Sequence, residues 1–525
     1  MILFCIAAVY RLGSWGVIDT SEARYSEIPR QMYETGDYLH PVYLGIEHYH
    51  KPPLTYHITA LSYHIFGPGT FGARFPLQVF LVFQLLFVWL IVREIYNDVY
   101  KATIGALIYA SFFIVWIASR NLTTDAYLCT FLLGAIWAII VYARRSKPVM
   151  LYAAAVLAGL AFLTKITASL VILGPVVLAV WWIYRDTWKW SWQMLPAGLI
   201  YLAVGMSWFV LLEQEGKPVL RYLLYDHSVV RYTTDTFGRN NPAYFYLLAA
   251  PVLGFPWIIM LFQSVIRHWR ARDLRLETGL LLAVWCAFPI VFYSISHSKL
   301  ILYILPAFAA VAVLTPHQLA VMKPKALRGW LVAQLIFYGL LIIAFLTYPL
   351  FSDYVIDLVP QMILVVLLVA MLSVILLHGN LRLPMRMALM SAVFALFAAM
   401  IGTHILSANE LKHSTAKPVA EWLQSAELDD RHVFILDRLA PSLSFHLQGP
   451  TAMIATSEKR ELQFEDDDGW QSYYYNLERA EDTRRLQKRL QEPSVLVARR
   501  RQEVPAMLQD HFTRETEIGK WRVYY

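Results

Sequence analysis

Long apolar runs recur along the first 405 residues of this 525-residue chain and constrain its fold more than any other feature. Runs of roughly 17–25 residues are long enough to cross the hydrocarbon core of a bilayer as helices. The composition agrees, since 58% of the residues are hydrophobic and only 16% are charged. A membrane β-barrel would instead show short segments of alternating hydrophobicity. The sequence therefore predicts an α-helical, polytopic membrane protein.

The apolar runs predict about thirteen spanning helices. They lie near 1–18, 71–92, 102–119, 123–143, 150–164, 166–184, 195–212, 243–266, 277–295, 300–316, 327–349, 355–377 and 385–405. The first run lacks a basic n-region and a small-residue cleavage site, so it is expected to be a retained span and not a signal peptide. The region 150–184 could also form one hairpin or a re-entrant pair.

Basic residues in short loops predict the orientation, because cytoplasmic loops of membrane proteins are enriched in Lys and Arg. One set of loops carries Arg93, Lys101, Arg144, Arg145, Lys147, Arg185, Lys189, the run 267–275, Lys323, Lys325, Arg328, Arg382 and Arg386. This set is expected to be cytoplasmic. The opposite, external face then receives two long connections, 19–70 and 213–242, and everything after residue 405.

The three cysteines and the net charge exclude two other classes of protein. Cys5, Cys129 and Cys286 each lie in an apolar run without CxxC spacing, so they are expected to pack and not to form disulfides or a zinc site. The formal charge of +7 is spread through the cytoplasmic loops, where it faces anionic lipid head groups. Nucleic-acid binding is therefore not indicated.

The composition changes after residue 405, which predicts a small soluble domain over 406–525, following the membrane domain over 1–405. The runs HVFIL, AMIA, SVLVA and WRVYY are typical of strands, and 476–491 is typical of an amphipathic helix. An α/β unit is therefore expected on the external side. It contains no catalytic motif, so its expected role is to cover or shape an external site.

The stretch DTSEARYSEI at 19–28 places several charges at the external membrane surface. Asp19 and Glu22 are spaced i and i+3, so a helix beginning there would put both carboxylates on one face. The same spacing is that of a capping box, with Asp19 as N-cap and Glu22 at the third helical position. Asp125, in SRNLTTDAYL, is expected on the same membrane face, where it could be a helix cap or a functional carboxylate.

Several cations are predicted on this face as well. Lys299 and Lys165 directly precede apolar runs, where a lysine can complete an anion site at a helix N-terminus or can simply reach the membrane interface. Arg231 lies in the second external loop, as does His227. His50 and His227 could ligate a divalent metal if further ligands converge, although the predicted chemistry requires no cofactor.

The acidic and basic side chains predicted on the external face suit one reaction. If a sugar is esterified to a lipid phosphate, cleavage at the anomeric carbon increases the charge on the phosphate, and nearby cations would stabilise that charge. A carboxylate within hydrogen-bond reach could accept the proton of the attacking hydroxyl group. Asp19 is favoured as this base, because a neighbouring carboxylate such as Glu22 or Asp125 could raise its pKa.

The run EARYSEIPRQMYETGDYLHPVYLGIEHYHKPPL resembles the first external loop of bacterial GT-C glycosyltransferases related to the aminoarabinose transferase of lipid A and to protein O-mannosyltransferases. GLAFLTK at 159–165 and SHSKLILYILP at 296–306 resemble later signatures of that family. The resemblance extends to about residue 310. Two positions depart from the family pattern: Ser21 stands where an aspartate usually precedes Glu22, and His50 replaces the glutamate of EKPPL.

The resemblance implies a transferase that takes a sugar from a polyprenyl phosphate on the periplasmic side of the bacterial inner membrane and inverts the anomeric centre. The implied acidic positions are Asp19 or Glu22, and Asp125. The implied donor-binding residues are Arg24, Lys51, Arg231 and Lys299, and Tyr25 and Lys165 are further candidates for donor binding. The expected acceptor is a lipid or a cell-envelope glycan. Two alternatives are a flippase of lipid-linked sugars, which would carry charges near the bilayer midplane, and a protein O-glycosyltransferase.

Overall fold

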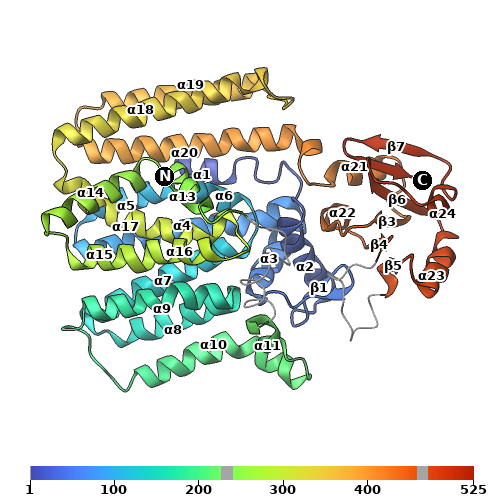
Figure 1. Cartoon of the computed structure of the whole chain (residues 1–525), viewed down its shortest axis with the longest axis horizontal. Coiled ribbons are helices and arrows are strands. Elements are labelled where there is room, and N and C mark those ends of the chain that lie inside the picture. The colour runs from blue at the N-terminus through green and yellow to red at the C-terminus, as the bar shows by residue number, and fades with distance from the viewer. Residues whose placement is uncertain (1, 226–240, 458–470) are drawn as a thin grey trace. The chain divides into compact units, whose positions relative to one another are not determined.

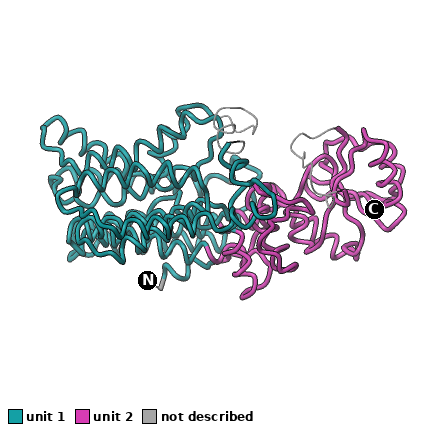
Figure 2. The backbone as a smooth tube through the Cα atoms, turned by 90° about the horizontal axis from the view of Figure 1, so that it is seen from below, with its two compact units in different colours: residues 1–10, 50–55, 77–402 teal, residues 11–49, 56–76, 403–525 magenta. Residues whose placement is uncertain are grey.

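The computed structural model describes residues 2–225, 241–457 and 471–525 (Figure 1). These residues divide into two compact units (Figure 2). Unit 1 comprises 1–10, 50–55 and 77–402, and unit 2 comprises 11–49, 56–76 and 403–525. Three helices cross the division, namely α3 (Leu54–Phe66), α4 (Thr70–Tyr96) and α20 (Leu383–Ala408). The predicted division placed the whole first external loop with the membrane domain, whereas here most of that loop groups with the C-terminal residues.

Unit 1 is helical throughout its described part. Its α-helices are α1 (Ile2–Val9), α5 (Val99–Ala110), α6 (Phe113–Arg120), α7 (Thr124–Arg145), α8 (Pro148–Thr164), α9 (Ile166–Ile183), α10 (Met194–Gln214), α11 (Val219–Leu224), α13 (Phe245–Leu253), α14 (Trp257–Ala271), α15 (Leu276–Leu281), α16 (Phe288–Ile295), α17 (Leu305–Val321), α18 (Pro324–Thr347) and α19 (Leu358–Leu377). A π-helical turn, η2 (Leu282–Ala287), joins α15 to α16, and 3₁₀ turns η3 (Ile301–Ile304) and η4 (Tyr348–Leu350) precede α17 and follow α18.

Nine helical segments of the described residues are long and apolar enough to span a membrane, or eleven if two bent helix pairs each count as one span. The bends are 62° between α5 and α6 and 105° between α13 and α14. The predicted number of about thirteen spans is therefore too high when only helices of at least 18 residues are counted. The first predicted span forms only the eight-residue α1, and another forms the 17-residue α8. Apolar composition alone does not reveal where a helix ends.

The positions of apolar side chains distinguish inner from outer helices within unit 1. The spans containing α7 and α17 are mostly buried, whereas only a small share of α18 is buried. On α18, Val332, Ile336, Leu340 and Ile343 are all exposed, and their spacing of three or four residues forms one stripe along the helix. An exposed apolar stripe on a spanning helix is suited to lipid and not to water.

The first-loop part of unit 2 contains α2 (Ser21–Thr35) and a short hairpin of β1 (Val42–Tyr43) and β2 (Ile46–Glu47). Leu44 and Gly45 form the two-residue connection, and both have positive φ values of 52° and 79°. Two consecutive positive φ angles are typical of the turn whose twist matches an antiparallel hairpin. The ring of Tyr473 lies where a Cβ on residue 45 would be, so glycine is required there for two reasons.

The C-terminal part of unit 2 is an α/β fold, as predicted. Its strands are β3 (His432–Leu436), β4 (Thr451–Ala455), β5 (Tyr474–Asn476), β6 (Ser494–Arg499), β7 (Glu515–Ile518) and β8 (Trp521–Tyr524), in the sheet order β5-β4-β3-β6-β8-β7. The pairs β5–β4, β4–β3 and β3–β6 are parallel, and the two pairs made by β8 are antiparallel. The helices are η5 (Glu410–Lys412), α21 (Lys417–Ser425), α22 (Pro441–Leu447), α23 (Ala480–Leu490) and α24 (Ala506–Gln509).

Helices cover both faces of this sheet (Figure 1). Val433 and Ile435 pack with residues of α21 and α22, whereas Phe434 and Leu436, on the same strand, pack with residues of α23 and α24. Successive side chains of a strand point to opposite faces, so an uninterrupted apolar run such as HVFIL is what a strand covered on both sides requires.

Candidate active site

The predicted site residues are distributed over both units. Asp19, Glu22, Arg24 and Tyr25 lie in unit 2, and His50, Lys51, Asp125, Lys165 and Lys299 lie in unit 1. Arg231 and His227 lie outside the described residues. The contacts within each unit therefore define two groups of functional candidates.

Asp19 lies two residues before α2 and is held by the C-terminal part of unit 2. Its carboxylate accepts hydrogen bonds from the backbone N–H of Ser442 at 3.0 Å and from the Ser442 hydroxyl at 2.8 Å. It does not cap α2, since the N-cap is Thr20 and no side chain caps this helix. Burial raises the pKa of Asp19 to about 6, while the Ser442 hydrogen bonds and the charges of Arg438 and Arg499 oppose this shift. The pKa is raised as predicted, but burial and not a neighbouring carboxylate is the cause.

Glu22 forms a fully buried ion pair with Arg74 of α4. The Arg74 Nε and one terminal nitrogen lie 2.8 and 3.0 Å from the two Glu22 oxygens. Arg74 also donates hydrogen bonds to backbone carbonyls of residues 12, 15 and 16, and its guanidinium lies 3.9 Å from the ring centroid of Trp15. The Glu22 carboxylate thus fixes the entry of the chain into α2. This arrangement favours a structural role for Glu22.

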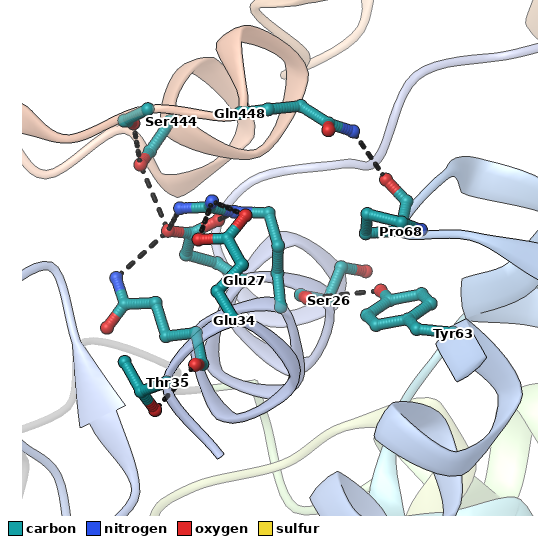
Figure 3. Close-up of polar contacts among 11 residues, drawn as sticks. Ser26, Glu27, Glu34, Thr35, Tyr63, Pro68, Ser444 and Gln448 are labelled. Carbon is teal, nitrogen blue, oxygen red and sulfur yellow. Dashed lines mark hydrogen bonds and ion pairs between the residues drawn. The ribbon is translucent and has the colours of Figure 1, made fainter. Parts of the chain in front are cut away.

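A second buried ion pair lies further along α2, where Glu27, Arg30 and Glu34 follow one another at helical spacing. Arg30 contacts Glu27 through two nitrogens at 2.7 and 2.6 Å and Glu34 at 2.6 Å. The Ser444 hydroxyl of α22 donates to Glu27 at 3.0 Å (Figure 3). Burial raises the pKa of Glu27 despite these partners. The i, i+3 and i+7 spacing was the sequence signal for this cluster, but nothing in it indicated Ser444.

A cavity of about 290 Å³ lies beside this cluster in unit 2. It is lined by Arg30, Gln31, Met32, Glu34, Thr35, His40, Val42, Leu44, Gly45, Gln448, Gly449, Pro450 and Tyr473. The lining therefore combines polar side chains of α2 with residues that follow α22.

Arg24 and Tyr25, the remaining predicted residues of unit 2, lie on the first half of α2. The Arg24 guanidinium is 3.5 Å from His48 Nε2 and 5.7 Å from the ring centroid of Tyr25. The Tyr25 ring stacks on Tyr56 of α3, with ring centroids 5.6 Å apart. Arg24 is thus positioned by aromatic side chains that precede and follow the hairpin.

In unit 1, Asp125 and Lys165 form an ion pair. The Lys165 Nζ lies 2.8 Å from the Asp125 carboxylate and 4.0 Å from the ring centroid of Tyr303. Asp125 occupies the first turn of α7, and Lys165 is the single non-helical residue between α8 and α9. Tyr303 belongs to η3, in the segment that follows Lys299. The structure therefore brings together residues from three of the segments that the sequence singled out.

Lys299 is buried, which excludes the interpretation that it merely reaches the membrane interface. Only 5% of the residue is exposed, and its Nζ donates to the carbonyl of Ser296 at 2.5 Å. Its own carbonyl accepts from Asn241 at 3.3 Å. Lys51 is partly exposed and lies just before Pro52 and Pro53, which are buried.

The predicted metal ligands can be assessed only in part. The His50 ring lies 6.0 Å from the ring of Tyr222, and His227 falls outside the described residues. Over 2–225, 241–457 and 471–525, no group of three His, Cys, Asp or Glu side chains is arranged to hold a metal ion. A site using His50 and His227 stays a prediction.

Comparison of the sequence with known proteins finds similar chains. A family model described as dolichyl-phosphate-mannose-protein mannosyltransferase matches residues 50–210. The undecaprenyl phosphate-alpha-4-amino-4-deoxy-L-arabinose arabinosyl transferase 2 of Pseudomonas fluorescens (strain Pf0-1) is 28% identical over 328 residues, which cover 61% of this chain and 58% of that protein. The corresponding transferase of Edwardsiella ictaluri (strain 93-146) is 28% identical over 323 residues, covering 60% and 57%. The chain thus matches less than two thirds of these relatives' length.

The fold is decided by solved structures. The crystal structure of ArnT from Cupriavidus metallidurans bound to undecaprenyl phosphate matches with a TM-score of 0.80 and 18% identity, over 100% of this chain and 96% of that one. The chain has the same fold as this ArnT. The apo structure of the same ArnT matches with a TM-score of 0.79 and 17% identity. The predicted fold class, an α-helical polytopic membrane protein with a small C-terminal α/β part, is confirmed.

Three residues of the site were not found from the sequence. Ser442, Arg74 and Tyr303 hold Asp19, Glu22 and Lys165 respectively. Each lies at least 52 residues from the residue it contacts. Tyr303 belongs to the segment SHSKLILYILP, but the sequence indicated no role for it, and Ser442 and Arg74 belong to none of the motifs. A buried arginine in the apolar segment TFGARFPLQ was the one available signal, because a charge in such a segment requires a partner.

Proposed function

We propose that this chain is an inverting glycosyltransferase that moves a sugar from a polyprenyl-phosphate-linked donor to a lipid or cell-envelope glycan, at the periplasmic face of the bacterial inner membrane. The observation that carries the proposal is the family match over 50–210, which contains Lys51, Asp125 and Lys165. The names of the arabinosyl transferases support the donor class. The predicted positive-inside orientation supports the periplasmic side.

The proposed reaction is a displacement at the anomeric carbon. An acceptor hydroxyl oxygen bonds to this carbon, and the bond between the carbon and the phosphate oxygen breaks with its electron pair left on the phosphate. The hydroxyl proton passes to a carboxylate. Lys51, Lys165 and Lys299 of unit 1 are the proposed cations for the phosphate, whose negative charge increases as the bond breaks. Arg24 of unit 2 and Arg231, which lies outside the described residues, stay sequence-based candidates for donor binding.

Two carboxylates are proposed as the base. Asp19 has a pKa of about 6, which suits a base that must accept a proton near neutral pH. Two of its lone-pair sites are used by Ser442, and a carboxylate offers about four. Asp125 is paired with Lys165, so its proposed role is to hold that lysine in place or to act as the base itself.

The test uses membranes supplied with a labelled polyprenyl-phosphate sugar, and it compares Asp19→Asn, Asp125→Asn and Lys51→Met with the unmodified chain. Loss of a general base typically reduces the rate by about 10²–10⁴-fold. If all three variants retain full transfer, the assignment of these residues is wrong. A chain that only moved the lipid-linked sugar across the membrane would leave the label on the polyprenyl carrier.

Ser442→Ala is the matched control for Asp19. It removes the hydrogen bonds of the serine hydroxyl but leaves the carboxylate in the chain. If Asp19 is the base, Ser442→Ala should lose far less activity than Asp19→Asn. If Asp19 serves only to hold unit 2 together, the two variants should lose activity to a similar extent, and Asp125 is then the remaining candidate.

A further inference from the structure

The C-terminal sheet of unit 2 reverses its strand order between two of its parallel strands. From β3 the chain proceeds to β4 and then β5 on one side, and β6 returns to the other side of β3. In open parallel sheets, ligands bind at the carboxyl ends of the strands where the order reverses. The carboxyl ends of β3 and β6 are therefore the place to look for a ligand.

Three cations gather at this edge. Arg438 follows the last residue of β3 by two positions, and Arg499 is the last residue of β6. Lys520 directly precedes β8, whose first residue, Trp521, pairs with Arg499 in the sheet. All three cations are partly exposed, so a ligand from solution can reach them.

Aromatic and backbone contacts hold these cations in place. The Arg499 guanidinium lies 4.0 Å from the ring centroid of Trp521, and that of Arg438 lies 5.4 Å from the same centroid. The Lys520 ammonium donates to the carbonyl of His413. Arg438 Nε is buried and has no hydrogen-bond partner among the described residues. A buried donor without a partner is costly unless a ligand satisfies it.

Among the residues that the structure describes, this cluster carries more positive than negative charge. Burial, followed by the charges of the neighbouring cations, lowers the pKa of Arg499 to about 10 and that of Lys520 to about 8. The Asp19 carboxylate opposes both shifts, and it is the one acid among the described residues whose charge acts on Arg499 and Lys520. Asp437, the nearest acid in sequence, already accepts hydrogen bonds from Thr456 and Gln502.

We propose that Arg438, Arg499 and Lys520 form a binding site for a phosphate group at the carboxyl edge of the C-terminal sheet. Two guanidinium groups can each donate two parallel hydrogen bonds to phosphate oxygens, and a lysine adds a point charge. The ligand is a phosphate group, either as the monoester head group of an anionic lipid or as the free inorganic ion. Phosphate binding here does not depend on the proposed transfer reaction, although Asp19, a candidate base for that reaction, lies within electrostatic reach of Arg438 and Arg499.

The first experiment measures binding to the purified full-length chain in detergent, with inorganic phosphate, dihexanoyl phosphatidate and dihexanoyl phosphatidylcholine as probes. Saturable binding of phosphate and phosphatidate, but not of phosphatidylcholine, is expected. Tighter binding of phosphatidate would identify a lipid head group as the source, and equal binding would identify the free anion. No saturable binding of either phosphate-bearing probe would overturn the proposal.

Variants localise the site. Arg438→Gln combined with Arg499→Gln should weaken phosphate binding by about 10-fold or more, since each guanidinium would donate charge-assisted hydrogen bonds to the phosphate. Arg501→Gln is the matched control, because Arg501 is exposed and lies two residues from Arg499. Equal weakening by the control and the double variant would contradict the assignment.

A second measurement does not require any variant to fold. With a pKa of about 8, Lys520 should react faster with an acylating reagent at neutral pH than an ordinary exposed lysine does. Bound phosphate should raise the pKa of Lys520 and slow its labelling. The full-length chain is labelled first and then digested, and the labelled peptides are quantified by mass spectrometry. Labelling of Lys520 that is insensitive to phosphate, relative to chloride at equal ionic strength, would count against the site.

Discussion

Unit 1 and unit 2 accommodate buried charge in different ways. In unit 1, Asp125 and Lys165 meet at the ends of helices within an apolar bundle. In unit 2, Glu22 and Glu27 each bind a buried arginine, and Glu27 also accepts a hydrogen bond from a residue 417 positions away in the sequence. The buried charges of the first external loop therefore have a structural role in unit 2, and charge alone does not identify a catalytic residue there. Substitutions in the charged pairs of each unit should distinguish structural charges from catalytic ones.

The largest effect is expected for Arg30→Ala in unit 2. This change leaves the fully buried Glu27 without its ion-pair partner, and removing one member of such a pair typically costs about 3–5 kcal/mol. The melting temperature of the purified chain in detergent should fall, and proteolysis of unit 2 should accelerate. Arg501→Ala, at an exposed arginine of the same unit, should change neither. A small effect of Arg30→Ala would show that water reaches Glu27.

A smaller effect is expected for the Asp125–Lys165 pair of unit 1, which is slightly more exposed. The variants Asp125→Asn and Lys165→Met should each destabilise the chain, and the double variant should lose less than the sum of the two. A coupling energy of about 1–3 kcal/mol is expected for residues in direct contact. Additive losses in the thermal unfolding of the four proteins would show that the pair contributes no mutual stabilisation.

The pH dependence of unfolding should distinguish Asp19 from a surface carboxylate. Its pKa is raised from an ordinary value of 3.8 to about 6, so the native chain binds this proton more tightly than the unfolded chain does. Stability from Asp19 is therefore present at about pH 4 and is lost as the pH rises through about 6. Between about pH 4 and about pH 6, the free energy of unfolding of Asp19→Asn should rise relative to that of the unmodified chain by about 1–2 kcal/mol. This range is smaller than the full pKa shift implies, because Asp19 is partly exposed to solvent.

His446 also contributes to the pH dependence of unfolding. It accepts a hydrogen bond from the backbone N–H of Val17, and burial lowers its pKa to about 3. Its contribution has the opposite sign, because stability is lost as the pH falls below the ordinary value of 6.5. Both proteins contain His446, so its effect cancels in the difference. A difference that does not vary with pH would contradict the raised pKa of Asp19.

The smallest effect is expected for Ser442→Ala. It removes one hydroxyl hydrogen bond to Asp19 but keeps the backbone N–H that donates the other. A loss of about 1 kcal/mol is typical, possible to measure as a shift in melting temperature. Ser444→Ala, which removes the hydroxyl bound to Glu27, is the comparison. Because the Ser442 hydroxyl also accepts from the backbone N–H of Ala416, Ser442→Ala should lose somewhat more than Ser444→Ala. An equal or smaller loss at Ser442 would show that its hydroxyl contributes little to holding Asp19.

Much of the fold could be predicted from the sequence because its signals are local. Apolar runs located the spans, and the strands HVFIL and SVLVA were recognised because both faces of the sheet are covered. The number of spans was less accessible, since the bends after α5 and α13 and the short α1 depend on packing. Boundaries set by tertiary contacts leave little trace in composition.

The partners of the candidate site residues were the least predictable feature. The acids and cations could be identified as chemically suitable, but the capping interpretation of Asp19 was wrong because Ser442 offers it a better-placed pair of donors. Such pairings join residues hundreds of positions apart and depend on the relative placement of α2 and α22. Spacing rules within one helix cannot specify them.

The bond between Asp19 and Ser442 spans 423 residues and therefore has a consequence for biogenesis. A ribosome adds about 5–20 residues per second, so the aspartate emerges roughly 20–80 s before its serine exists. During that interval the N-terminal segment of unit 2 must wait, already exported if the predicted orientation holds, for the last quarter of the chain to follow it. Maturation of the first external loop is thus tied to completion of translation, and a nascent chain truncated before α22 should leave that loop open to protease.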